Sequence, residues 1–292
     1  MDLRVPGSPW RVALAGCGRV GTAVAELLRR RGHSVVGVAS RSPQSVARAE
    51  RLLAAPGFSL DGPLPACDVL LVGASDAAIE PLVARLASHL APSTVVWHFA
   101  GTFGLAPLDA ALRAGAVGLA LHPVQTCPDV AAALRLLPGS AWGLTASEPV
   151  AQWGAHMVER ELEGKAFLLA EEHRPIWRAA SVVTANCVRA LLATSEELLR
   201  AIGVTEPGAV VVPAARGALD TAAEGGGGAT LTGPVVRGET DTIARHLESL
   251  ARHAPDCIAG YRLVAQLVLG GAVDAGRIRE EDAEPMRALL GR

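Results

Sequence analysis

The first residues whose spacing suggests chemistry form a glycine-rich loop near the start of the chain. The sequence Gly16-Cys-Gly18-Arg-Val-Gly21 follows the apolar run 11–15 and opens a segment with helical periodicity. In such a loop the first glycine makes the turn, the second lets backbone approach a diphosphate, and the third lets helix and strand pack closely. The helix N-terminus then faces the phosphates. We expect a dinucleotide site, the alternative being a glycine turn without ligand. The predicted contacts are Gly16, Gly18, Arg19, Val20 and Gly21.

The residues after the second apolar run indicate which dinucleotide binds. An NAD site usually places Asp or Glu about 20 residues beyond the glycines, where the carboxylate binds the ribose hydroxyls. Here the chain reads Val38-Ala39-Ser40-Arg41-Ser42, with no acid. Ser40 and Arg41 could hydrogen-bond and neutralise a 2′-phosphate instead. This favours NADP (as NADPH); the alternative is that Arg41 is a solvated loop residue.

A further polar pair, Ser75-Asp76, follows the apolar run 69–74. In open α/β sheets ligands lie beyond the carboxyl ends of the strands. Ser75 could therefore contact the ribose or the nicotinamide side of the cofactor. Asp76 could instead only cap the next helix.

Two histidines follow further strand-like runs. His98 lies in Trp97-His-Phe-Ala-Gly101, and His122 lies in Leu121-His-Pro-Val-Gln125-Thr126. Reduction of a ketone produces an alkoxide that must be protonated, and His122 is the best-placed candidate acid. His98 is a second catalytic candidate, and Gln125 and Thr126 add polar groups for substrate. For each histidine the alternative is a buried ring that serves the fold.

The second half of the chain offers three further candidates. Asn186 lies within a helical pattern, where Asn has no capping role, so it could hold a carbonyl oxygen. The segment 231–239 contains Thr232 and Arg237, and Arg237 could bind a substrate carboxylate bidentately. A salt bridge from Arg237 to Glu239 is the alternative.

These candidates require particular elements to position them. Short apolar runs alternate with helical patterns up to residue 170, which predicts an α/β domain with a doubly wound parallel sheet covered on both faces. After residue 170 the pattern is helical only. We therefore expect an NADP-binding Rossmann domain over residues 1–170 and an all-α domain over 171–292, with substrate and dimer contacts. The predicted strands are 11–15, 35–39, 69–74, 94–99, 116–121, 141–145 and 165–169, and the later helices are 175–201, 240–253 and 255–270.

Four motifs occur in this order along the chain: Gly16-x-Gly18-x-x-Gly21, His122-Pro-Val-Gln-Thr126, Ala179-Ala-Ser-x-x-x-Ala-Asn186 and Thr232-Gly-Pro-x-x-Arg-Gly-Glu239. They resemble a bacterial family that joins a Rossmann-like NADP-binding domain to a C-terminal helical domain of unknown function. That family is similar in architecture to 6-phosphogluconate dehydrogenase-like, β-hydroxyacid, ketopantoate and pyrroline-carboxylate reductases. The resemblance spans nearly the whole chain. It implies a 6-phosphogluconate dehydrogenase-like helical domain, NADP use and a homodimer built through that domain.

The sequence departs from the better-known relatives at one catalytic position. β-Hydroxyacid dehydrogenases and ketopantoate reductases place a catalytic lysine three or four residues before the asparagine that matches Asn186. Here those positions are Val183 and Val182. A Phe commonly follows the His-Pro-x-Gln-Thr motif, and here it is Cys127. Cys127 could be a nucleophile, but no neighbouring motif residue would activate it.

Composition excludes several classes of function. Lys165 is the only lysine and Tyr261 the only tyrosine, so a Tyr-x-x-x-Lys proton relay is impossible. The net charge of −2 argues against nucleic acid or an anionic membrane as partner. Five dispersed cysteines indicate a reducing compartment and no zinc site. The first nine residues lack a signal-peptide pattern, and we expect a cytoplasmic protein.

The sequence thus predicts an NADP-dependent oxidoreductase that reduces a small carbonyl or imine compound, such as a 2-keto acid. Hydride transfer would belong to the cofactor, and the protein would orient the substrate and manage charge. An imine can arrive already protonated, so that an acid matters less. The alternative is a non-catalytic NADP-binding sensor, because the missing lysine leaves room for lost catalysis.

Overall fold

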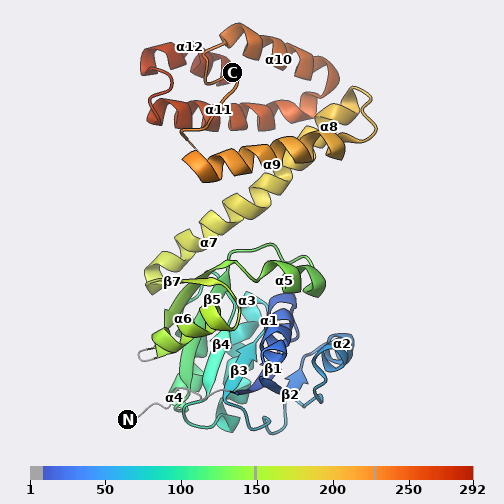
Figure 1. Cartoon of the computed structure of the whole chain (residues 1–292), viewed down its shortest axis with the longest axis vertical. Helices are drawn as coiled ribbons and strands as arrows, with labels where there is room; N and C mark the ends of the chain where they lie inside the picture. Colours follow the sequence, from blue (N-terminus) through green and yellow to red (C-terminus); the bar gives the residue numbers. More distant parts are fainter. Residues whose placement is uncertain (1–8, 148–149, 227, 292) are drawn as a thin grey trace. The chain divides into compact units, whose positions relative to one another are not determined.

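A seven-stranded sheet forms the centre of the first part of the chain (Figure 1). The computed structural model describes residues 9–147, 150–226 and 228–291. The chain divides into two compact units, residues 1–185 (unit 1) and 186–292 (unit 2). The strands of unit 1 are β1 (Arg11–Ala15), β2 (Ser34–Ala39), β3 (Val69–Val72), β4 (Val95–His98), β5 (Val117–Pro123), β6 (Ala141–Ala146) and β7 (Lys165–Leu168).

The strand order is β2-β1-β3-β4-β5-β6-β7, and the first five strands run parallel. The predicted parallel sheet is thus present, with one exception: β6 pairs antiparallel with β5. Pro123 lies opposite Trp142, so the chain enters β6 at the edge where it left β5. The connecting helix α5 (Val130–Leu136) packs on α1 (Arg19–Arg30) and does not carry the chain back to the other edge.

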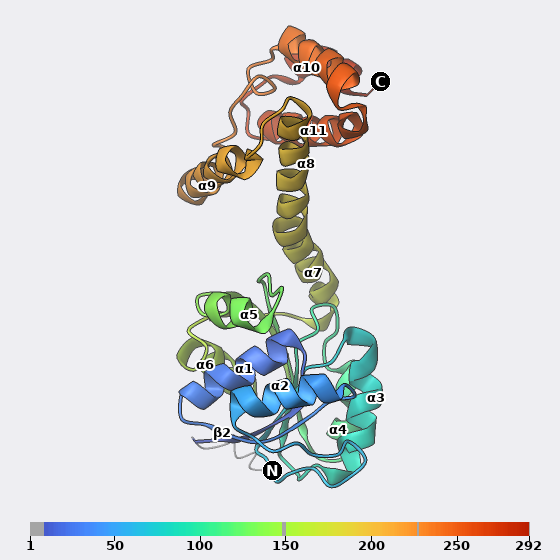
Figure 2. The same ribbon diagram turned by 90° about the vertical axis from the view of Figure 1, so that its right-hand side faces the viewer.

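Both faces of the sheet are covered, as predicted, because successive strand residues point to opposite faces. Val69 and Leu71 belong to one core, with residues of α1, α2 (Pro43–Leu53), α5 and α6 (Val150–Arg160). Leu70 and Val72 belong to a second core, with α3 (Asp76–Leu86) and α4 (Asp109–Arg113). Figure 2 shows α3 and α4 on one side of unit 1 and α5 and α6 on the other. Ser42 caps α2 through its hydroxyl, which accepts from Ser45 N–H, and Pro43 occupies the first helical position.

The predicted helix 175–201 is present but not uniform. It comprises α7 (Arg174–Val182), a π-helical turn (Val183–Cys187) and α8 (Val188–Ala201). The two units divide within the π-helical turn, later than the predicted boundary near residue 170. The reason is that α7 remains attached to the sheet: Arg174 hydrogen-bonds to Ala120 O of β5 and to the Thr145 hydroxyl of β6.

Unit 2 is helical. After α8 it contains α9 (Pro207–Gly225), α10 (Thr240–His253), α11 (Ile258–Asp274) and α12 (Glu280–Leu290). Ile243, Leu269 and Met286 come from three of these helices and form one buried core. Residues 255–274 are long and apolar enough to cross a membrane by length and composition, but Ala265, Leu269 and Ala272 of this segment belong to that core. The predicted fold class, a Rossmann-like domain followed by a helical domain, is confirmed.

Candidate functional site

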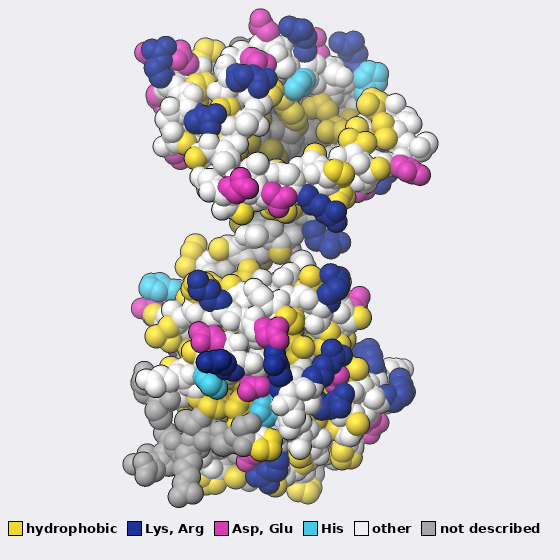
Figure 3. Space-filling model, viewed as in Figure 1, with side chains coloured by type: hydrophobic (Ala, Val, Ile, Leu, Met, Phe, Trp, Pro, Cys, Tyr) yellow, Lys and Arg dark blue, Asp and Glu magenta, His cyan; other side chains and the backbone are white. Residues whose placement is uncertain are grey.

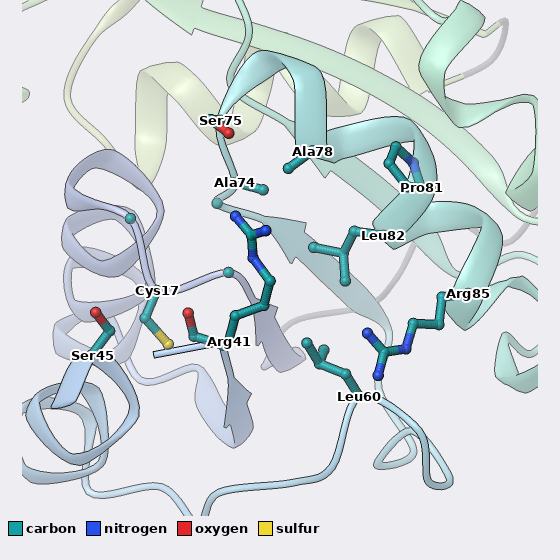
Figure 4. A pocket seen from close by; sticks show the side chains of 14 residues that line it. Cys17, Arg41, Ser45, Leu60, Ala74, Ser75, Ala78, Pro81, Leu82 and Arg85 are labelled. Carbon is teal, nitrogen blue, oxygen red and sulfur yellow. The ribbon is translucent and has the colours of Figure 1, made fainter. Parts of the chain in front are cut away.

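A trough lies where β1, β2 and β3 end in unit 1. Its larger cavity has a volume of about 480 Å³ (Figure 4). A second cavity of about 250 Å³ adjoins it and shares Gly18, Gly73 and Ala74 with it. Every residue predicted to bind the cofactor lines one of the two. The larger cavity is lined by Gly16, Gly18, Ser40, Arg41 and Ser75 of that set, and the second by Gly18, Arg19, Val20 and Gly21.

The glycines of the loop are required by contact with a fourth glycine, Gly73. Gly18 N–H donates to Gly73 O at 3.0 Å, and a Cβ atom on Gly18 would lie 2.4 Å from that oxygen. A Cβ atom on Gly73 would lie 2.3 Å from Gly16 O, and Gly16 itself has a φ of +84°. The second glycine was predicted to admit a diphosphate, whereas its closest neighbour is the end of β3. Sequence reasoning missed Gly73, whose signal is a glycine directly after a buried strand.

The start of α1 offers amide groups to an anion. No side chain caps this helix, and its Thr22 N–H bonds to Gly18 O. The N–H groups of Arg19, Val20 and Gly21 precede that bond and therefore have no partner within the helix. Together with the helix dipole they suit a diphosphate.

The end of the larger cavity away from the start of α1 is polar, and two positively charged side chains, Arg41 and Arg85, line it. Figure 4 shows Arg41 extending toward Ala74, and Arg85 reaching from α3 toward Leu60. Arg85 Nε donates to Asp61 Oδ1 at 2.8 Å, so part of its charge is already balanced. The described residues that line this cavity include no Asp or Glu. Sequence reasoning missed Arg85, because it lies thirteen residues beyond the end of β3, in the last turn of α3.

Ser75 and Asp76 both line the trough, Ser75 in the larger cavity and Asp76 in the second. Ser75 occupies the N-cap position of α3, and Asp76 is the first helical residue. The alternative that Asp76 caps this helix is therefore wrong. Its carboxylate at the helix start is stabilised by the dipole.

Two thiols lie beside the trough, and both are in their neutral form. Burial raises the pKa of the Cys17 thiol to about 11, and its Sγ lies 3.5 Å from Ala39 O. Burial also raises the pKa of Cys127, which lines the second cavity. A nucleophilic cysteine needs a lowered pKa, so neither thiol is activated. Among the described residues no group of three or more His, Cys, Asp or Glu side chains could hold a metal ion.

His98 is fully buried at the end of β4 and has no ring nitrogen left for a substrate. Nδ1 accepts from Ala100 N–H at 3.1 Å, and Nε2 lies 2.7 Å from Gly104 O, to which it must donate. Burial, together with a smaller effect of the nearby Arg174 and against the hydrogen bond to Gly104, lowers the pKa of His98 to about 4. We therefore remove His98 from the catalytic candidates and regard it as the residue that shapes the loop 99–104.

His122 lies at the end of β5, beneath α7. Its Nδ1 accepts from the Trp177 indole N–H at 3.2 Å, and its Nε2 lies 3.5 Å from Arg178 Nη1. An indole nitrogen only donates, so the proton of the neutral imidazole must be on Nε2. Burial, followed by the charges of Arg178 and Arg174, lowers the pKa of His122 to about 3. The predicted role of His122 as a proton-donating acid is corrected: the residue is a neutral hydrogen-bond donor at physiological pH.

Arg174 connects this region to the sheet. Its guanidinium is fully buried and donates to Ala120 O, Ala100 O and the Thr145 hydroxyl, while Nε has no partner among the described residues. Burial lowers the pKa of Arg174 to about 10, so it remains a cation at neutral pH. A buried cation bonded only to neutral oxygens adds positive potential beside His98 and His122.

Gln125 and Thr126 bond mainly to the loop that contains them. The Gln125 amide donates to Leu136 O and to the Ser140 hydroxyl, and its oxygen accepts from the N–H and the hydroxyl of Thr126. These contacts hold the turn after β5 in place. Their predicted contact with substrate stays a prediction.

Asn186, Thr232 and Arg237 belong to unit 2, whereas His122 belongs to unit 1, so their common site stays a prediction. Asn186 is exposed in the π-helical turn. Arg237 Nε donates to Glu239 Oε1 at 2.5 Å, which is the salt bridge named as the alternative. This pair raises the pKa of Arg237 and lowers that of Glu239. Thr232 lines a separate cavity with Thr221, Thr230 and Arg277.

Comparison with protein-family models also divides the chain into two parts, but at an earlier point than the two compact units. Residues 4–123 match a Rossmann-like domain model, and residues 140–268 match the domain of unknown function DUF2520. The chain thus joins a Rossmann-like domain to a DUF2520 domain. The DUF2520 match begins at β6, so the last two strands of the sheet belong to it. No curated protein matches the sequence significantly.

Several solved structures share the fold over almost their whole length. A protein from Bacteroides fragilis, BF3122, assigned as an NADP oxidoreductase, is 21% identical with a TM-score of 0.76, covering 89% of this chain and 98% of that one. A pyrroline-5-carboxylate reductase from Coxiella burnetii is 16% identical (TM-score 0.59; 95% and 99% covered). A reductive aminase from Aspergillus terreus, solved with NADPH, is 15% identical (TM-score 0.59; 98% and 93% covered). At such identities the likeness shows the fold.

Proposed function

We propose that the protein is an NADPH-dependent reductase of a small compound with a C=N bond. The observation that carries this proposal is the pairing of a dinucleotide-sized trough with a histidine that is held neutral. The trough begins at the uncapped start of α1 and ends at Arg41 and Arg85. The likeness to pyrroline-5-carboxylate reductases and reductive aminases supports the same class of reaction.

The polar end of the trough favours NADP over NAD. A ribose diol is usually held by a carboxylate, and no Asp or Glu is among the described residues lining the larger cavity. Ser40, Ser45 and Arg41 instead provide donors suited to a 2′-phosphate. Leu60, Ala78 and Leu82 form an apolar wall against which a planar base fits.

The state of His122 favours an imine over a ketone. When bound, the nicotinamide supplies a hydride, and a ketone then needs a proton from an acid. His122 cannot supply it, because its pKa is about 3 and its Nδ1 already accepts from Trp177. An iminium substrate brings its own proton and becomes an uncharged amine on receiving hydride. His122 would then orient the substrate through Nε2–H, and Asn186 stays a proposed second donor.

The decisive assay is NADPH oxidation with cyclic imines and 2-keto acids of matched size. We expect turnover with an imine and little with the corresponding keto acid. The variants Asn186→Ala and His122→Ala should both lower kcat, and unchanged kcat in both would remove them from the site. Tight NADPH binding with no turnover across the panel would favour the non-catalytic sensor.

We also propose a homodimer formed through unit 2. Figure 3 shows hydrophobic side chains gathered over the region of α8. Sedimentation of Leu219→Glu should show a monomer, whereas Leu263→Glu on α11 should leave the dimer intact. The opposite pattern would place the interface elsewhere. The large exposed apolar residues of α8, α9 and their connection include Leu191, Ile202, Val210, Val212 and Leu219.

A further inference from the structure

We propose that His122 and Arg178 form a binding site for a carboxylate group. The motivating feature is a pair of hydrogen-bond donors that face one another without an acceptor between them. His122 Nε2 and Arg178 Nη1 are 3.5 Å apart, and both residues belong to unit 1. The proposal rests on the proposed function only in taking the carboxylate to be part of the substrate.

The donor conflict follows from counting lone pairs on His122. A neutral imidazole has one nitrogen lone pair, and two side chains that can only donate, Trp177 and Arg178, point at its two nitrogens. Trp177 is the closer, at 3.2 Å, and occupies Nδ1. Nε2 must then carry a proton, so Arg178 cannot donate to it. An oxygen that accepts from both groups resolves the conflict.

The Trp177 contact is built into the sheet. Gly143 of β6 lies directly opposite His122 of β5 in the antiparallel pair. A Cβ atom on Gly143 would lie 2.7 Å from Trp177 Nε1, so only glycine leaves room for the indole to reach the histidine. Phe167 of β7 packs against the indole, with ring centroids 5.9 Å apart. The direction of the His122 donor is therefore fixed by the fold.

Arg178 is held beside His122 but is not neutralised. Its Cδ would lie 2.7 Å from a Cβ atom on Gly101, so the side chain crosses that glycine closely. Ser181 accepts from its Nη1 at 3.4 Å. Within the described ranges no Asp or Glu forms a salt bridge with Arg178. The buried cation Arg174 adds positive potential nearby, and after burial these two charges are the next causes of the low pKa of His122.

The ligand class follows from these donors and from where they lie. A carboxylate has two oxygens that can accept from an N–H and from a guanidinium together, and charge-assisted bonds of this kind are strong. A Cβ atom on Gly101 would lie 3.0 Å from His122 Nε2, and Gly101 follows Ala100, which lines the second cavity of the trough. A small acid bound here would lie next to the end of the trough farthest from Arg41.

The test measures binding of cyclopentanecarboxylate and of its neutral analogue cyclopentanecarboxamide to the full chain. Histidine side chains labelled with ¹⁵N report the His122 signal, which is identified by its loss in His122→Asn. We expect the carboxylate to shift this signal with Nε2 still protonated. Arg178→Met should weaken carboxylate binding roughly 10- to 100-fold, the usual effect of one charge-assisted bond. Equal binding of acid and amide, or of wild type and Arg178→Met, would overturn the proposal.

Three controls sharpen the result. Arg113→Met removes an exposed arginine at the end of α4, shortly before the amino end of β5, whereas His122 lies near the carboxyl end of that strand. This variant should leave binding unchanged. Arg178→Lys keeps the positive charge but lacks the planar, forked donor geometry of the guanidinium. It should therefore bind the carboxylate more tightly than Arg178→Met and less tightly than the wild type. Trp177→Phe frees Nδ1, so His122 should populate the other tautomer and bind the carboxylate more weakly. An unchanged tautomer in Trp177→Phe would contradict the mechanism.

The outcome is separable from that of the reductase proposal. Carboxylate binding that depends on Arg178, in a protein that never oxidises NADPH, would retain this site and reject the reductase. Turnover whose KM for acidic and neutral imines responds equally to Arg178→Met would reject this site and retain the reductase.

Discussion

The indole N–H of Trp177 lies 3.2 Å from Nδ1 of His122, and this contact determines which ring nitrogen of the histidine carries the proton. Neither residue by itself fixes the position of this proton. Gly143 admits the indole, α7 supplies it, and β5 presents the imidazole. Burial lowers the pKa of His122 from the usual value near 6.5 to about 3, and the indole contact keeps the proton of the neutral ring on Nε2.

The first prediction concerns the pH dependence of turnover. Because the pKa of His122 is lowered to about 3, the residue is neutral throughout the range from pH 5 to pH 8. Steady-state kcat/KM should therefore show no inflection near pH 6.5 that is lost in His122→Asn. An inflection present in the wild type and absent from that variant would show that His122 titrates during catalysis.

The second prediction concerns stability in acid. His98 and His122 have pKa values of about 4 and about 3 in the folded state, below the value of about 6.5 in the unfolded chain. Below pH 6.5 the unfolded state therefore binds more protons. Their contribution to stability is complete above pH 6.5 and falls by about 1.4 kcal/mol per pH unit for each histidine as pH falls toward 4.

Urea unfolding between pH 7 and pH 5 measures this loss for unit 1 alone, because all five tryptophans lie in that unit. In His98→Asn the unfolding free energy should fall less steeply with pH, because only one of the two histidines still contributes to the loss. An identical slope in this variant would mean that His98 is not held neutral by the fold.

The third prediction concerns the glycine contact beneath the trough. Gly73→Ala would place a methyl group 2.3 Å from Gly16 O, and backbone on both sides cannot yield without displacing the loop. We expect a loss of about 1–3 kcal/mol or more in unfolding free energy and a weakened NADPH complex. Gly260→Ala in α11 is the control, because nothing lies within 4 Å of its Cβ position. That helical site should gain roughly 0.5–1 kcal/mol. Thermal unfolding followed by circular dichroism compares the two.

The fourth prediction concerns cofactor choice. Arg41→Ala should weaken NADPH binding roughly 10- to 100-fold and leave NADH binding little changed, because only NADPH carries the 2′-phosphate. Arg85→Ala should have a smaller effect, since Asp61 already balances part of its charge. Asp61→Asn should then strengthen NADPH binding. Equal losses for NADPH and NADH in Arg41→Ala, measured by fluorescence titration, would refute the phosphate role.

Much of the nucleotide half was predictable because its signals are local. The loop Gly16–Gly21 and the strand β1 depend on neighbouring residues, and each is found where expected. The antiparallel turn into β6 was not predictable. Its apolar pattern fits a strand of either direction, and the direction depends on where the connection packs.

The sequence by itself determined which residues could do chemistry near the trough, because strand ends in an α/β sheet meet at one edge. Only the tertiary structure decided their chemical state. His98 and His122 look alike in sequence, each at the end of a buried strand. One has both nitrogens bonded to its own loop, and the other presents a fixed N–H beside Arg178. Protonation depends on burial and on contacts such as Trp177 with His122, which join positions 55 residues apart and leave no trace in local sequence.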